Sequence, residues 1–141
     1  MMLKTRTIVR PADNPLTAKT QVLEGKWSPQ VVKNGIGFAF AWIAKQQGMT
    51  AFEIADTNSM LPLFDYGHTL YCVQLKPEDK VSMYDVCVYE TMENDLIVHR
   101  VVKTDYVSNR FYFKGDNNFF ADGWIDRVQV KYRVAVISYD R

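Results

Sequence analysis

The chain has 141 residues, a hydrophobic fraction of 48%, a charged fraction of 23% and a formal net charge of +1. This length and composition are typical of one globular domain and exclude a disordered or fibrous chain. The nearly balanced charge gives no electrostatic reason to expect nucleic acid as a partner.

Residues 1–27 contain Pro11 and Pro15 and show little hydrophobic periodicity. We expect a loosely ordered arm there, with one short edge strand around 7–9, followed by a single domain over 28–141. No apolar run follows the charged residues at the start, and the longest apolar stretch, 36–44, is about half of the ~20 residues that span a bilayer. The sequence therefore predicts a soluble, cytoplasmic protein without a transmembrane span.

A helix is predicted over residues 29–47, because Ser28-Pro29 is a helix-start signal and Gly48 is a stop signal. Between them, apolar residues recur at helical spacing: Val32, Ile36, Ala39, Phe40 and Ile43. Such a stripe usually faces a core, and we favour that reading. Peripheral contact with a membrane through residues 29–47, with Trp42 in the anchor, is the alternative.

From residue 50 to 138 the pattern changes to short strands separated by turn residues. The expected strands cover 51–56, 68–75, 83–90, 96–104, 109–114 and 128–138. They indicate a mainly β fold with a coiled, antiparallel, partly barrel-like sheet. Cys72 and Cys87 fall in two neighbouring strands and are expected to be buried free thiols. No histidine shares a metal-ligand spacing with them, so we expect no metal site and no cofactor.

Three segments of this β region carry residues with catalytic chemistry. Ser59 lies in a turn-like segment, His99 lies in a predicted strand, and Asp116 and Asp122 follow a later strand. A serine hydroxyl is a poor nucleophile until a base takes its proton and a third group orients that base. Each of these residues alone would more often be an ordinary turn or strand residue. Their combination predicts a serine peptidase.

The same segments resemble the signal peptidase and SOS-repressor superfamily of serine peptidases. The resemblance covers roughly residues 52 to 138 in the correct order: a nucleophile turn (Ser59-Met60-Leu61-Pro62), a glycine (Gly67), a strand motif (His99-Arg100-Val101) and a final Lys114-Gly115-Asp116-Asn117-Asn118 segment. The resemblance implies the fold described above and a peptidase active site. Met60, Pro62, Gly67, Arg100, Lys114 and Gly115 are then expected to support that site structurally.

The residue before Arg100 selects a subgroup. Bacterial signal peptidases and SOS repressors have a lysine there, whereas His99 is similar to the archaeal and endoplasmic-reticulum signal peptidases. A lysine base needs a strongly lowered pKa, whereas histidine, with an ordinary pKa of ~6.5, needs an acceptor for its other nitrogen. By resemblance Asp116 and Asp122 complete the site, with Asp122 favoured for direct contact and Asp116 for support. Thr57 matches a position where a hydroxyl helps the Ser59 N–H to bind the oxyanion.

The chain departs from the family pattern at two Gly-Asp positions, which are Gly67-His68 and Tyr84-Asp85 here, and it has no predicted membrane anchor. His68 is a minor rival to His99 as the base.

We expect a soluble serine endopeptidase that cleaves an extended protein or peptide substrate, after small residues by resemblance. Self-cleavage near 39–41 is a weaker variant. The alternative is an inactive peptidase-fold domain with a binding or regulatory role. Oligomeric state is not indicated.

Overall fold

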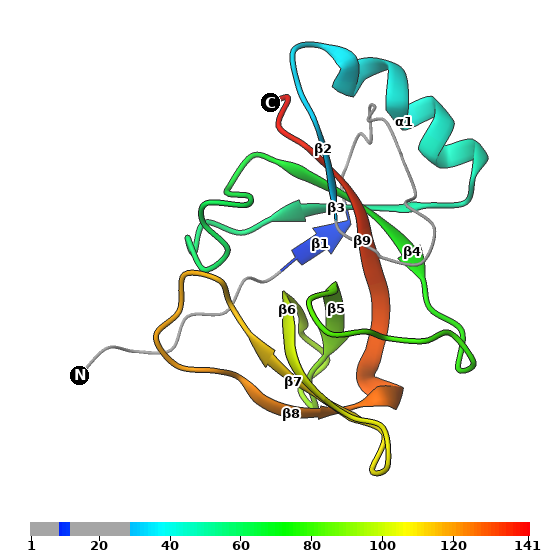
Figure 1. Cartoon of the computed structure of the whole chain (residues 1–141). Coiled ribbons are helices and arrows are strands. Elements are labelled where there is room, and N and C mark those ends of the chain that lie inside the picture. The colour runs from blue at the N-terminus through cyan, green and yellow to red at the C-terminus, as the bar shows by residue number, and fades with distance from the viewer. Residues whose placement is uncertain (1–8, 12–28) are drawn as a thin grey trace.

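The computed structural model of the chain describes residues 9–11 and 29–141 (Figure 1). Its strands are β1 (Val9–Pro11), β2 (Gln30–Val32), β3 (Thr50–Ile54), β4 (Thr69–Gln74), β5 (Val86–Glu90), β6 (Leu96–Asp105), β7 (Arg110–Lys114), β8 (Gly123–Asp126) and β9 (Val130–Ser138). The helices are α1 (Ile36–Gln46) and a short 3-10 helix, η1 (Arg127–Gln129). The rest of the predicted N-terminal arm, including residues 7 and 8 of the expected edge strand, lies outside the described residues.

The described strands form one curled sheet in the order β1-β3-β4-β9-β5-β6-β7-β8, with β2 added to β9. All pairings are antiparallel except that of β2 with β9. The register shifts once in each of three strand pairs, β4–β9, β5–β9 and β6–β7. Such irregularities bend a strand and increase its twist, which lets the sheet curl into a half-barrel. The predicted mainly β fold, with a coiled, partly barrel-like sheet and one helix, is confirmed.

The predicted strands all occur, with shifts at their ends. The strand expected over 83–90 begins only at Val86, because Tyr84 takes a left-handed conformation with φ 73°. The strand expected over 128–138 begins at Val130, after η1. Strand β8 was not predicted. Both cysteines are buried and free, as predicted, but they lie on β4 and β5, which are separated in the sheet by β9.

The predicted start of the helix is wrong. Residues 30–32 form β2, which pairs with β9 in parallel, and α1 begins at Ile36. Between the two elements, Asn34 and Gly35 both have positive φ and turn the chain. The carboxylate of Asp140 then accepts hydrogen bonds from the Gly35 and Gly37 backbone N–H groups at 3.2 and 2.7 Å. A distant acidic side chain therefore satisfies the start of the helix, where unpaired N–H groups favour negative charge.

The helix packs on the sheet, but the predicted stripe is wrong in its members: Ile36 and Ile43 are 47% and 37% exposed, and Phe40, Ala41 and Ala44 form the buried face. Phe40 is 1% exposed and meets Tyr71 of β4 edge to face at 5.4 Å between ring centroids. Ala44 is buried in the same cluster against β9, whereas Trp42 is 70% exposed on the outer side. Within the described residues, no helix is long and apolar enough to cross a membrane.

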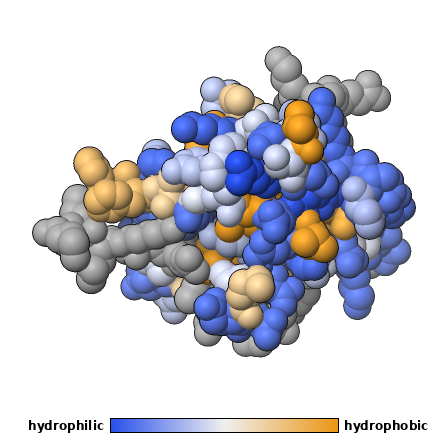
Figure 2. All heavy atoms as spheres, turned by 90° about the horizontal axis from the view of Figure 1, so that it is seen from below, coloured by the Kyte–Doolittle hydropathy of each residue, from blue (hydrophilic) through white to orange (hydrophobic). Residues whose placement is uncertain are grey.

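The sheet has apolar clusters on both of its faces, and the candidate site lies among them. Alternation along β6 places Ile97, His99 and Val101 on one face, and Val98 on the other. On the side of the molecule shown in Figure 2, hydrophobic residues form small separate patches among hydrophilic ones. Along β6, His99 is a polar residue between two buried apolar residues of the same face, Ile97 and Val101.

Candidate active site

The candidate nucleophile, Ser59, lies in the turn that follows β3. Asn58 before it has φ 58°, a left-handed conformation that asparagine tolerates better than most residues. Ser59 is 1% exposed, and the following Met60 is equally buried within the core. The turn therefore holds the hydroxyl inside the molecule, and the Met60 side chain packs in the core next to it.

The segment after β7 clamps this turn. The backbone N–H of Asn117 donates to the Ser59 carbonyl at 2.9 Å, and its side-chain amide donates to the Asn58 carbonyl at 3.0 Å. The N–H of Asp116 lies 3.3 Å from the Met60 sulfur. A Cβ on Gly115 would lie 2.8 Å from the Ser59 carbonyl oxygen. Glycine is therefore needed at 115 because two backbones approach closely there.

The base candidate, His99, lies beside the nucleophile. Its Nε2 is 3.2 Å from the Ser59 Oγ, although the two residues are forty positions apart. The imidazole is fully buried in the middle of β6, paired across the sheet with Cys87 of β5. The strand thus fixes the ring position. The distance allows proton transfer between the two side chains.

Of the two aspartates, Asp122 completes the group. Its Oδ2 lies 2.6 Å from the His99 Nδ1, and both side chains are fully buried. The Asp122 N–H donates to the Phe113 carbonyl at 2.8 Å, which holds this residue beside the end of β7. A carboxylate only accepts hydrogen bonds, so it favours a proton on Nδ1 and leaves Nε2 facing Ser59 as the acceptor.

Asp116 lies elsewhere. Both of its carboxylate oxygens accept hydrogen bonds from Arg100, at 2.8 and 3.0 Å, and the pair is partly exposed. Arg100 also donates to the Tyr84 carbonyl at 2.9 Å. Asp116 therefore joins the clamp segment to β6 and does not contact His99, so its expected support of the base is indirect at most.

Thr57 is close to the nucleophile, as its expected oxyanion role requires. Its Oγ1 is 3.2 Å from the Ser59 Oγ and accepts a long hydrogen bond of 3.5 Å from the Ser59 N–H. Both donors expected for an oxyanion are thus next to the reacting hydroxyl. In this arrangement the Ser59 N–H is directed at the Thr57 Oγ1, so an oxyanion stabilised by both donors would have to replace the threonine oxygen as the acceptor of that N–H.

The remaining expected supports occupy structural positions. Pro62 follows a cis peptide in the turn after Ser59, and Gly67 has φ 87°, which glycine adopts without strain. Lys114 donates to the Gly115 carbonyl at 3.1 Å at the start of the clamp. The rival histidine, His68, accepts from the Asp65 N–H through Nδ1 and stacks on Tyr139. These contacts assign His68 to the turn before β4.

Two residues of the site escaped sequence reasoning. The Tyr89 hydroxyl donates to the Asp122 Oδ2 at 2.5 Å, and Asn117 closes the clamp on the serine turn. Tyr89 lies in an apolar run where a tyrosine is unremarkable, so no local signal marks it. Asn117 was part of the quoted motif, but only the approach of the two loops reveals its role.

Other groups in the described residues offer less chemistry. Burial raises the pKa of both thiols, Cys72 and Cys87, so they remain protonated at neutral pH. No three histidine, cysteine or carboxylate side chains come together there in a way that would hold a metal ion. The small-residue stretch 39–41 lies inside α1, where Phe40 and Ala41 are buried. Cleavage at that stretch would require the helix to unwind.

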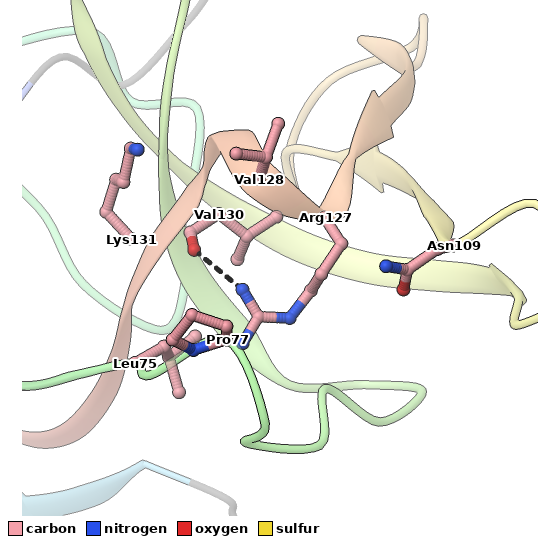
Figure 3. A pocket seen from close by; sticks show the side chains of 7 residues that line it. All are labelled: Leu75, Pro77, Asn109, Arg127, Val128, Val130 and Lys131. Carbon is pink, nitrogen blue, oxygen red and sulfur yellow. Dashed lines mark hydrogen bonds between the residues drawn. The ribbon is translucent and has the colours of Figure 1, made fainter.

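A separate cavity of about 270 Å³ lies between η1, the start of β9 and the turn after β4 (Figure 3). Arg127 is one of its lining residues, and its guanidinium donates to the carbonyls of Val130, Lys76 and Asp79 at 3.1, 2.7 and 3.0 Å. These bonds fasten the turn to the 3-10 helix. The Ser59, His99 and Asp122 side chains do not line this cavity, and Arg127 stabilises the contact between the two segments.

No family model matches the chain, and comparisons with curated proteins and with solved structures give no significant match.

Proposed function

We propose that the protein is a serine endopeptidase with Ser59 as nucleophile, His99 as general base and Asp122 as the residue that orients the base. One observation carries the proposal: a continuous line of contacts runs from the Ser59 Oγ through the imidazole to the Asp122 carboxylate, with steps of 3.2 and 2.6 Å. Three residues far apart in the chain meet in the order that acyl transfer requires.

In the proposed reaction the Ser59 oxygen attacks the carbonyl carbon of the scissile peptide bond while His99 Nε2 takes the hydroxyl proton. The resulting imidazolium lies against the Asp122 carboxylate, which stabilises its charge. His99 then gives the proton to the leaving amine, and an acyl-enzyme remains on Ser59. Water, activated by the same imidazole, hydrolyses the ester. Thr57 and the Ser59 N–H bind the oxyanion in both steps.

The edge of β3 is the natural place for an extended substrate, because β3 leads directly to Ser59. In the structure this edge is occupied by β1, which pairs antiparallel with β3 from Val9–Ile54 to Pro11–Phe52 and also contacts β6 (Figure 1). This edge thus accepts an added strand, a common mode of peptide binding. We propose that a substrate displaces β1, so a variant lacking residues 1–11 is expected to cleave peptides with a lower KM.

Burial of the site favours the second candidate function. Ser59 and His99 are 1% and 0% exposed, so the structure offers a peptide little direct access to them. A domain that keeps the fold and binds partners without turnover would have the same enclosed residues. The two candidates differ in whether the hydroxyl reacts with an electrophile.

A fluorophosphonate probe distinguishes them. Labelling of the wild-type protein and its loss in Ser59→Ala supports the peptidase, and Ser108→Ala, on an exposed hairpin turn, is the matched control that keeps its label. Cleavage of a mixed peptide library should likewise be retained in the wild-type protein and Ser108→Ala and lost in Ser59→Ala. Undiminished proteolysis by folded Ser59→Ala would refute the assignment. A folded wild-type protein that neither labels nor cleaves, with or without residues 1–11, would favour the binding domain.

A further inference from the structure

A tyrosine from a neighbouring strand shares the Asp122 oxygen that binds the imidazole. The Tyr89 hydroxyl lies 2.5 Å from Oδ2, and the His99 Nδ1 lies 2.6 Å from the same atom. Two donors therefore converge on one carboxylate oxygen. Hydrogen bonds to an ionised acceptor at these distances are among the stronger ones in proteins.

The surroundings fix the tyrosine in this position. Tyr89 is 1% exposed, and its ring packs against Phe113 with 4.8 Å between the centroids. Phe113 in turn accepts the Asp122 N–H through its carbonyl. On β5, Tyr89 lies two residues beyond Cys87, the partner of His99 across the sheet. The same pair of strands thus sets the positions of the phenol and the imidazole.

We propose that Tyr89 is a positioning residue of the catalytic group: its hydroxyl holds the Asp122 carboxylate against His99 and takes a share of the carboxylate's negative charge. This inference rests on the proposed peptidase function. A carboxylate that also accepts a phenol hydrogen bond attracts an imidazolium less strongly than a carboxylate that faces the imidazole alone. Loss of the hydroxyl is therefore expected to strengthen the attraction between the Asp122 carboxylate and a protonated His99.

The other titratable groups near the imidazole are neutral or already paired, so we assign the effect on the Asp122 carboxylate to Tyr89. The Cys87 thiol is neutral because burial raises its pKa. The nearest basic side chain along β6, Arg100, is paired with Asp116. The titratable groups on the His99 face are Cys87 and Tyr89 of β5 and Asp122 from the loop before β8. On β9, Arg133 is the register partner of Cys87 and forms a buried ion pair with Asp85 at 3.2 Å. Arg100 and its partner Lys114 of β7 lie on the opposite face of β6. Ser59 faces the imidazole from the turn after β3.

The test compares Tyr89→Phe with Tyr106→Phe. Both changes remove one tyrosine hydroxyl, but the Tyr106 hydroxyl donates to the Val81 carbonyl at 2.8 Å, outside the site. In Tyr89→Phe the acid limb of the pH–rate profile of kcat/KM is expected to move up by roughly 0.5–1 pH unit. Well below the midpoint, kcat should fall about 3- to 10-fold with little change in KM, and the loss should be smaller at neutral pH. The Tyr106→Phe profile should match wild type.

Nuclear magnetic resonance of the imidazoles separates failure of this inference from failure of the peptidase proposal. The chain has two histidines, so His68→Asn leaves His99 as the single signal to titrate. In this background Tyr89→Phe should move the His99 titration midpoint to higher pH, whether or not the protein cleaves peptides. An unmoved midpoint overturns the role of Tyr89. A moved midpoint in a protein that never reacts with a fluorophosphonate supports the coupling and overturns the peptidase.

Replacement of Tyr89 by 3-fluorotyrosine keeps the ring and guards against misfolding of Tyr89→Phe. A fluorinated phenol is a stronger acid and a stronger donor, so the midpoint and the acid limb should both move to lower pH, opposite to Tyr89→Phe. Movement in the same direction as Tyr89→Phe would overturn the inference, because it would show that the ring environment and not the hydroxyl controls the imidazole.

Discussion

Replacement of Asp122 by asparagine tests the orientation of the base most directly. In the wild-type protein Oδ2 accepts from both His99 and Tyr89, at 2.6 and 2.5 Å. Both donors meet the same atom, so an asparagine that places its amide nitrogen at the Oδ2 position donates to the His99 Nδ1 and no longer accepts from the Tyr89 hydroxyl. The imidazole proton then moves to Nε2, the atom that should accept the proton of Ser59. The geometry stays the same and the tautomer becomes wrong.

The expected loss is large. A wrong tautomer in a serine–histidine–carboxylate group lowers kcat by ~10⁴. At 1.36 kcal/mol for each tenfold change, this corresponds to about 5 kcal/mol of lost transition-state stabilisation. Removal of a charged acceptor from two buried hydrogen bonds also lowers the free energy of unfolding, by about 1.5–3 kcal/mol. Thermal unfolding must therefore be measured beside kcat/KM, so that activity is compared only between folded proteins.

Asp116→Asn is the matched control, the same chemical change six residues earlier. Its carboxylate pairs with Arg100 at the surface, where 21–23% of each side chain is exposed. An exposed pair of this kind contributes about 0–1 kcal/mol to stability, and kcat/KM should change less than about threefold. Peptide cleavage and fluorophosphonate labelling rates provide two independent readouts. The assignment of Asp122 fails if folded Asp122→Asn stays within tenfold of wild type, or if Asp116→Asn loses as much.

Further changes test the supports of the site. Gly115→Ala should lower kcat by about 10- to 100-fold in a folded protein, because the new Cβ would lie 2.8 Å from the Ser59 carbonyl and displace the nucleophile; full activity would show that the clamp is not needed. The free energy of unfolding of Tyr84→Gly should exceed that of Tyr84→Ala by about 1 kcal/mol, because residue 84 has φ 73° and glycine adopts positive φ without strain. Equal denaturant midpoints for the two variants would contradict this. Burial lowers the pKa of His68, so its protonation opposes folding and stability falls as pH drops below the ordinary value of ~6.5. His68→Asn keeps an acceptor for the Asp65 N–H, so denaturation at pH 7 and pH 5 should show a smaller acid loss for the variant while peptide cleavage is retained.

Much of the fold follows from local patterns in the sequence. Alternation and turn residues locate six of the strands, because a strand with one buried face must repeat every second residue. The helix stop at Gly48 is also local, since glycine adopts φ 70° there at little cost. The start of the helix is not local. Asp140 caps it from the far end of the chain, and pairing with β9 draws residues 30–32 out of the predicted helix.

The order of Ser59, His99 and the two aspartates is likewise visible in the sequence, together with the residue types that acyl transfer needs. Which aspartate meets the imidazole depends on how β6, β7 and the loop before β8 lie together: Arg100 holds Asp116 while the Phe113 carbonyl holds Asp122 beside His99. Tyr89 joins them only through the register of β5 against β6. Local sequence determines which chemical groups are present and which strands carry them. The tertiary structure alone decides which groups meet, because hydrogen bonds of 2.5–3.2 Å between distant residues depend on strand order and register across the whole sheet.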